Sequence, residues 1–105
     1  MTRVSRLNYP QSAQHIEEAQ AEGRPVLLTV DRSGAAARRA ASLKGVPTVR
    51  GFDRDEYPPA VFKEGGAGSH VKHIPFSDNR GSGSSIGNQL RDVPDGSTVQ
   101  LESSS

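Results

Sequence analysis

The sequence contains no cysteine and no tryptophan in 105 residues, and aromatic side chains make up only 5% of it. Without cysteine, neither a disulfide framework nor a thiolate metal site can form. No apolar run approaches the roughly 18 residues of a membrane-spanning helix, so we expect no membrane partner. The first ten residues lack the apolar segment of a signal peptide. With 32% hydrophobic residues, the chain is expected to form one small domain with a thin core, which excludes a large multilayer enzyme fold.

The net charge is only +1, but the charged residues are unevenly distributed. Residues 24–54 hold seven lysines and arginines against two aspartates, and the remainder of the chain has an acidic excess. This distribution is typical of a protein that binds a polyanion and also holds a cation. Charge alone favours an ordinary solvated surface over that interpretation. The sequence has no P-loop, no dinucleotide-binding glycine pattern and no nucleophile elbow, so ATPase, dinucleotide-binding and serine hydrolase functions have no support.

Hydrophobic patterning and turn residues predict alternating strands and helices. The expected helices are 11–22, 35–44 and 84–92, the expected strands are 4–9, 25–30, 69–75 and 97–101, and 46–53 and 60–63 are expected to be extended. This order predicts an α+β fold, a small mixed or antiparallel sheet with helices packed on it. We expect a single domain over residues 1–102, followed by a disordered tail at 103–105.

The densest polar cluster is Asp53-Arg54-Asp55-Glu56. Three carboxylates in four residues repel one another unless positive charge lies among them. Arg54 can neutralise one, and a hard divalent cation such as Mg²⁺ or Mn²⁺ suits the oxygen atoms of the others. On a continuous strand, Asp53 and Asp55 would share one face and Glu56 would lie on the other. An acidic surface turn is the alternative interpretation.

A second cluster, Asp78-Asn79-Arg80-Gly81, leads towards Asn88. Asn79 and Asn88 are nine positions apart, which places them on opposite sides of a helix, so at most one can contact a shared ligand directly. A helix-capping turn is the alternative for Asp78 and Asn79. Glu64 lies in a glycine-rich loop, where its carboxylate could orient a neighbouring group.

The three histidines give a weaker signal. His15 is expected at the surface of the first helix. His70 and His73 alternate along a strand, so they cannot form a two-histidine ligand pair.

Several ordered motifs together resemble the NucA/NucB deoxyribonuclease family, in particular its NucB branch from bacilli. The resemblance covers about residues 4–101 and is carried by DRSGAAARRAASLKGVPT (31–48), DRDEYPPA (53–60), KEGGAG (63–68), SDNRGSGSSIGNQL (77–90) and PDGS (94–97). It implies a metal-dependent, sequence-nonspecific DNA endonuclease with a ββα-metal (His-Me finger-like) core. In that group a strand supplies an Asp-Arg-Gly-His motif, and a following helix supplies a metal-binding asparagine.

The resemblance also implies roles for individual residues. The strand motif corresponds to residues 53–56 here and lacks the histidine, so a carboxylate must replace the usual imidazole base. We expect Asp55 to be the general base, with Glu56 as its partner or as a group of the metal site. The expected ligands of the divalent ion, Mg²⁺ or Mn²⁺, are Asn79, Asp53 and Glu64. Asn88 and Asp78 are expected to contact these ligands and hold them in place without binding the ion themselves. The residues expected to bind phosphates are Arg54, Arg80, Arg38, Arg39 and Lys44.

The sequence departs from the family at two cysteine positions. The resemblance implies a cysteine pair in the Bacillus members where this chain has Leu28 and Phe62, which predicts apolar packing in place of a disulfide. We expect a monomeric, secreted enzyme or a delivered toxin domain, with DNA as the substrate and with RNA and a protein inhibitor left open as partners. The alternative function is a catalytically inactive nucleic-acid-binding or interaction module on the same fold.

Overall fold

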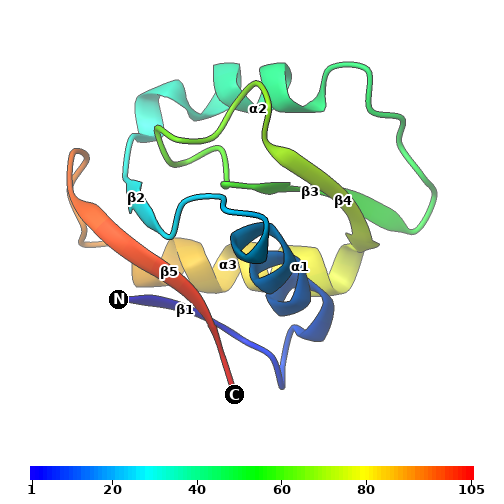
Figure 1. Cartoon of the computed structure of the whole chain (residues 1–105), viewed down its shortest axis with the longest axis horizontal. Coiled ribbons are helices and arrows are strands. Elements are labelled where there is room, and N and C mark those ends of the chain that lie inside the picture. The colour runs from blue at the N-terminus through cyan, green and yellow to red at the C-terminus, as the bar shows by residue number, and fades with distance from the viewer.

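The computed structural model describes all residues, 1–105, as two small sheets and three α-helices (Figure 1). The first sheet has the order β1–β5–β2, in which β5 (Thr98–Ser104) runs parallel to β1 (Thr2–Ser5) and antiparallel to β2 (Leu27–Thr29). The second is an antiparallel hairpin of β3 (Phe52–Tyr57) and β4 (His70–Pro75). The mixed sheet, the hairpin and the packed helices confirm the α+β prediction. No helix combines the length and the apolar character that crossing a membrane requires.

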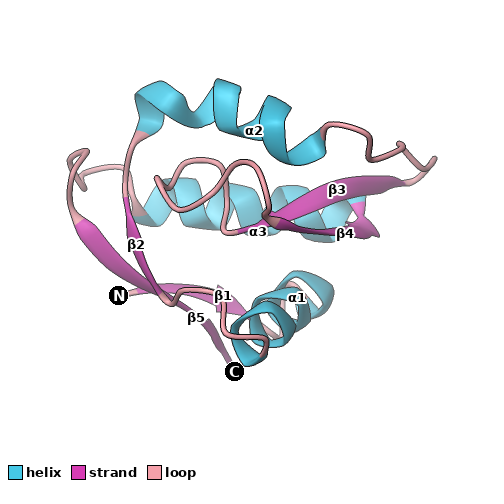
Figure 2. Cartoon of the chain, turned by 45° about the horizontal axis from the view of Figure 1, so that its top comes forward, coloured by secondary structure: helices cyan, strands magenta, loops and turns pink.

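The three helices lie around the hairpin. α1 (Pro10–Ala21) and the three-stranded sheet lie on one side of it, and α2 (Ala35–Leu43), preceded by a short 3₁₀ turn at Arg32–Gly34, lies on the other (Figure 2). α3 (Phe76–Gln89) begins directly after β4 and runs back beneath the hairpin. Two antiparallel strands followed at once by a helix is the element order that the ββα expectation requires.

α1 forms the centre of the hydrophobic core. It begins at Pro10, where the fixed φ of proline suits the first helical position. Ala13, Ile16 and Ala19 recur at helical spacing on its buried face and pack with residues from both sheets. Leu28 and Phe62 are both completely buried in this same core cluster. Apolar packing therefore occupies the two positions at which the family resemblance implies cysteines, as expected.

Asp78 joins α3 to the start of α1. Its carboxylate accepts hydrogen bonds from the backbone N–H groups of Gln11 and Ser12, both at 3.0 Å, and from the Ser12 hydroxyl at 2.6 Å. Those N–H groups belong to the first turn of α1 and have no partner within the helix. The negative charge also lies at the positive end of the helix dipole. Asp78 is thus a helix cap, as the alternative interpretation held, but for α1 rather than for its own helix.

Four element predictions differ from the structure. The stretch expected to be extended at 46–53 contains a turn, and the strand of this region is β3. The last helix begins at Phe76 instead of Ser84, because glycines 81 and 83 adopt helical backbone angles instead of ending the helix. The first strand ends at Ser5, since the backbone N–H of Tyr9 bonds back to the carbonyl of Ser5 and turns the chain into α1. Residues 60–63 form a single bridge, between Val30 and Phe62, rather than a strand.

The C-terminal tail is also not as predicted. β5 continues to Ser104 because Ser103 and Ser104 pair with Val4 and Ser5 of β1. The backbone N–H of Arg6 extends this pairing by donating to the carbonyl of Ser104 at 2.7 Å. A run of serines has no hydrophobic pattern, so the pairing could not be inferred from composition.

Replacing Asp78 by alanine should destabilise the fold. Loss of the cap leaves two first-turn N–H groups of α1 without their acceptor, so the free energy of unfolding should fall by about 1 to 2 kcal/mol. Chemical denaturation of Asp78→Ala beside wild type measures this. Asp92→Ala, which removes an exposed carboxylate near the end of α3, is the matched control. An unchanged denaturation midpoint for Asp78→Ala would show that the cap contributes nothing.

Candidate functional site

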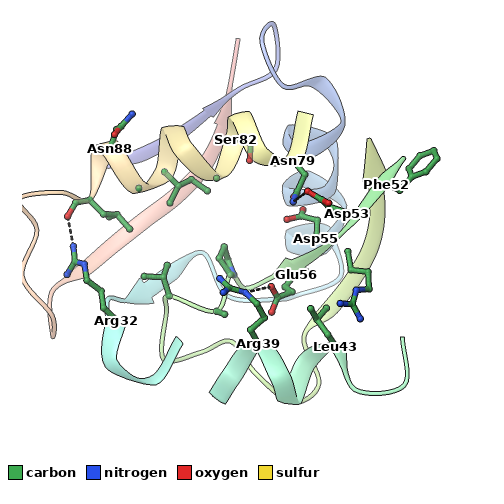
Figure 3. Close-up of a pocket in the computed structure, with 18 of the residues that line it drawn as sticks. Arg32, Arg39, Leu43, Phe52, Asp53, Asp55, Glu56, Asn79, Ser82 and Asn88 are labelled. Atoms are coloured by element: carbon green, nitrogen blue, oxygen red, sulfur yellow. Dashed lines mark hydrogen bonds and ion pairs between the residues drawn. The ribbon is translucent and has the colours of Figure 1, made fainter. Parts of the chain in front are cut away.

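A groove of about 830 Å³ lies between α2 and α3 (Figure 3). Residues of α2, including Arg39 and Leu43, line one wall, and residues of α3 from Asn79 to Asn88 line the other. Residues 52–56 of β3 line the end of the groove at which Asn79 lies. We call this cavity the α2–α3 groove. It brings together four of the five residues predicted to be catalytic or to bind the metal: Asp53, Asp55, Glu56 and Asn79.

The alternation of β3 divides the three carboxylates between two faces. Asp53 and Asp55 contact α3 and α1, respectively, through their side chains. Glu56 contacts Ser42 of α2 on the opposite face. This is the division expected from strand geometry, and residues from both faces line the groove.

Asp53 lies next to Asn79, the asparagine expected to bind metal. Asn79 Nδ2 donates to Asp53 Oδ2 at 3.2 Å, and Arg80 forms a two-pronged ion pair with the same carboxylate at 3.0 and 3.1 Å. Hydrogen bonds from Arg80, followed by the bond from Asn79, lower the pKa of Asp53. The Arg80 guanidinium also lies 4.9 Å from the centre of the Phe76 ring. Arg80 is therefore held by its neighbours and is not a free phosphate ligand in this state.

Asp55 is held from beneath by a completely buried histidine. Asp55 Oδ2 lies 2.6 Å from His15 Nδ1, and His15 Nε2 lies 2.8 Å from His70 Nδ1. An ionised carboxylate can only accept, so the His15 Nδ1–H donates to Asp55. His70 continues towards the surface, where its Nε2 lies 3.6 Å from a carboxylate oxygen of Glu22. The structure thus connects Asp55 to solvent through two imidazole rings.

The expectation that His15 is exposed is wrong. Its side chain is 0% exposed, because His15 lies with Ser12, Ile16 and Ala19 on the buried face of α1. The signal was in the sequence: 12, 15, 16 and 19 follow the spacing of one helix face. The polarity of histidine concealed it, and nothing in the spacing identified Asp55 as its partner.

Glu56 is the most enclosed of the three carboxylates. Its side chain is 10% exposed, accepts a hydrogen bond from the Ser42 hydroxyl, and lies 3.7 Å from Arg39 Nε. Burial raises the pKa of Glu56, and the hydrogen bond from Ser42 and the charge of Arg39 only partly oppose this. Glu56 therefore gives up its proton less readily than an exposed glutamate does.

The structure does not bring Glu64 to this group. Its two carboxylate oxygens accept hydrogen bonds from the backbone N–H of Thr29 at 2.8 Å and from the Thr29 hydroxyl at 2.9 Å. Glu64 does not line the groove. Its geometry is that of a brace between the loop and β2, which corrects its expected place among the metal ligands.

The guanidinium of Arg38 is also occupied by contacts within the fold. Its guanidinium donates to the Ala60 carbonyl at 2.7 Å and to the carboxylate of Asp31 at 2.9 Å, and it also bonds the Asp31 carbonyl. These contacts attach α2 to the loop after β3 and leave little of the guanidinium free for phosphate. Arg38 was expected to bind phosphate, but its acceptors come from residues 31 and 60, which a basic run does not identify.

The other expected cations lie at or near the groove. Arg39 is largely exposed on its α2 wall, and Arg54 lines it while one nitrogen donates to the Val46 carbonyl at 3.0 Å. Lys44 is exposed beside both, on a smaller hollow of the surface. Arg91 lines the far end of the groove and bonds Asn88 Oδ1 at 2.7 Å, so Asn88 lies far from Asp53 (Figure 3). No motif in the sequence pointed to Arg91.

A groove with carboxylates at one end and arginines on its walls is the arrangement of a protein that acts on a polyanion with the help of a cation. Residues 20–101 match the family model described as deoxyribonuclease NucA/NucB. The DNA-entry nuclease of Bacillus subtilis (strain 168) is 52% identical over 91 residues, which cover 87% of this chain and 62% of that relative. The chain thus spans less than two thirds of the relative's length. It belongs to the NucA/NucB deoxyribonuclease family, which confirms the resemblance seen in its motifs.

Glu56 should make stability depend on pH. Because its pKa in the folded chain is raised above the ordinary 4.5, the folded chain binds this proton more tightly than the unfolded chain does. The contribution of Glu56 to stability is therefore present below pH 4.5 and is lost as the pH rises through the raised pKa. In Glu56→Gln this component is absent.

Urea denaturation of wild type and Glu56→Gln across this pH range tests the assignment. The difference in unfolding free energy should move in favour of the glutamine variant as the pH rises, and should then level off. Parallel pH dependences of the two proteins would contradict it.

Proposed function

We propose that the chain is a metal-dependent endonuclease that hydrolyses phosphodiester bonds of DNA without sequence specificity. The observation that carries this proposal is the pairing of Asp53 with Asn79 next to Asp55 in an arginine-lined groove. Membership of a deoxyribonuclease family and the name of the Bacillus subtilis relative support DNA as the substrate. The same name, which refers to DNA entry, supports an extracellular place of action.

The residues at this end of the groove fit a hydrated divalent ion. No three His, Cys, Asp or Glu side chains gather into a closed metal cage. Asn79 Oδ1 and the carboxylate of Asp53, which would exchange its pairing with Arg80 for the ion, offer hard oxygen atoms from two neighbouring elements. This suits Mg²⁺ or Mn²⁺, because such ions keep several waters and bind few protein groups. When bound, the ion would supply positive charge to a phosphate oxygen and to the leaving oxygen.

Asp55 is the general base in this proposal. One carboxylate oxygen is fixed by His15, and the residue lines the groove, so the other oxygen is available to a water molecule there. Asp55 takes a proton from that water. The oxygen of the water attacks the phosphorus, and the bond from phosphorus to the leaving ribose oxygen breaks. Glu56 is held by Ser42 on the other face of β3 and contributes negative charge near Asp55.

The arginine and lysine side chains near the groove explain why cleavage should have low sequence specificity. Arg39, Arg54 and Lys44 lie on or beside the α2 wall, where they can contact backbone phosphates. Phosphate contacts position a nucleic acid but carry no sequence information. They also make binding weaken as the salt concentration rises.

A plasmid-nicking assay tests the activity and the base together. Wild type should nick supercoiled DNA with Mg²⁺ or Mn²⁺ and should stop when EDTA is added. Asp55→Asn keeps the size of the side chain but cannot accept the proton, so nicking should fall by about 100-fold or more. Asp92→Asn, at an exposed position outside the groove, is the control.

Other outcomes of that assay are equally informative. Nicking that survives Asp55→Asn but not Glu56→Gln would move the base to Glu56. Well-folded wild type that binds DNA without cutting it under either metal would overturn the enzyme proposal and leave a binding module.

His15 is a positioning residue for Asp55, and two variants distinguish the roles of its two ring nitrogens. The amide nitrogen of asparagine falls near Nδ1, which donates to Asp55, and that of glutamine falls near Nε2, which faces His70. Loss of the Nδ1 contact should let Asp55 move, so kcat of His15→Gln should fall about 10- to 100-fold, and His15→Asn should retain more. The comparison is made on kcat and KM, with unfolding midpoints for both variants. Equal losses would show that His15 only fills space.

A further inference from the structure

α3 contains three glycines, Gly81, Gly83 and Gly87, within fourteen residues. Glycine inside a helix is less stable than alanine because it loses more backbone freedom on folding. None of the three has a positive φ that would require glycine. Each therefore needs another reason, and the fold supplies one for only the first.

Gly81 is required by packing. A Cβ atom there would lie 2.4 Å from Cε1 of Tyr9, which packs against α3. At Gly83 and Gly87 a Cβ atom would meet no other atom within 4 Å. The packed fold thus accounts for Gly81 and leaves Gly83 and Gly87 without a structural cause.

Gly83 and Gly87 both line the α2–α3 groove, and they lie four residues apart on one face of the helix. Their face begins next to Asn79, at the proposed metal end, and continues along the helix towards the turn that holds Asn88 (Figure 3). From Asn79 to Gly87 the helix rises about 12 Å. The open backbone of α3 is therefore one wall of the groove.

Ser82 provides an independent observation on the same wall. The residue is 5% exposed and lines the groove, and its hydroxyl makes no hydrogen bond within the chain. Figure 3 shows this hydroxyl next to the groove between Asn79 and Asn88. No buried side-chain nitrogen or oxygen of the chain lacks a partner, so this oxygen must reach the groove, where it can donate to a ligand that offers an oxygen atom.

We propose that the surface of Ser82, Gly83 and Gly87 is a seat for the sugar-phosphate backbone of the DNA strand being cut, beyond the nucleotide at which cleavage occurs. The absent side chains let the strand approach the helix closely, and the Ser82 hydroxyl donates to one of its oxygens. At about 3.4 Å per nucleotide, the 12 Å wall extends over several nucleotides. This inference rests on the proposed nuclease function.

The test uses Gly83→Ala, Gly87→Ala and the double variant. Each should raise Tm by a few degrees, because alanine favours the helix and its methyl group meets open space. The same variants should raise KM for DNA, by about 10-fold or more in the double variant, since the strand can no longer reach the helix. Ser82→Ala should raise KM for DNA without raising Tm comparably.

Ser84→Ala is the matched control: it improves helix propensity in the same helix, at an exposed position that does not line the groove. It should leave KM for DNA unchanged. A small diester, bis(p-nitrophenyl) phosphate, reaches only the catalytic end, so its turnover should be the same in wild type and in the glycine variants.

The outcomes separate the two proposals. Wild type that cleaves neither DNA nor the small diester would overturn the nuclease function itself. Wild type that cleaves DNA, with glycine variants that gain Tm and keep the wild-type KM for DNA, would overturn the strand seat alone. An equal loss on DNA and on the small diester would also overturn it, because that loss would lie in the chemistry.

Discussion

The position of α1 is the constraint on which the rest of the structure depends. Its start is held by the carboxylate of Asp78 from α3, and its middle places His15 beneath Asp55 of β3. Near its end, Gln20 donates to the hydroxyl of Tyr57 and to the carbonyl of Leu101, each at 2.7 Å. One short helix thus fixes α3, the hairpin and the three-stranded sheet relative to one another. The proposed site lies where the first two of these meet.

The polar contacts of α1 explain how a site is built on a thin core. Each contact joins segments far apart in the chain, so few buried apolar residues are needed to fix their relative positions. His15 shows the principle most clearly, because a completely buried imidazole must have partners for both nitrogens. Here those partners are Asp55 and His70, and satisfying the core also orients the proposed base.

The sequence predicted the relative placement of the strand carboxylates and Asn79 better than it predicted the elements around them. Alternation along a strand correctly placed Asp53 and Asp55 on one face and Glu56 on the other, since that depends only on local geometry. The family motifs brought Asn79 to Asp53, which are 26 positions apart. The partner of His15 is 40 positions away and follows from how α1 packs, which no local pattern encodes.

The errors in the helices and strands have related causes. Glycine is a helix breaker by propensity, so α3 was predicted to begin late, although packing against Tyr9 makes Gly81 favourable there. The serine tail has no pattern of its own and is ordered by pairing with β1. In both cases tertiary contacts override a weak local preference.

The charge distribution was the least reliable guide to the phosphate-binding residues, because a count of arginines takes no account of what each one contacts. Arg38 and Arg32 lie in the basic segment, yet their guanidinium groups donate to backbone carbonyls and pair with Asp31 and Asp95. In a chain without disulfides, these bonds hold the loops that close the fold. The positive charge that remains for a polyanion is therefore smaller than the composition indicates, and Arg39, Arg54 and Arg91 place part of it on the α2–α3 groove. Arginines of a short basic segment in such a protein either hold loops or remain for a polyanion. Only the acceptors around each guanidinium show which of the two an arginine does.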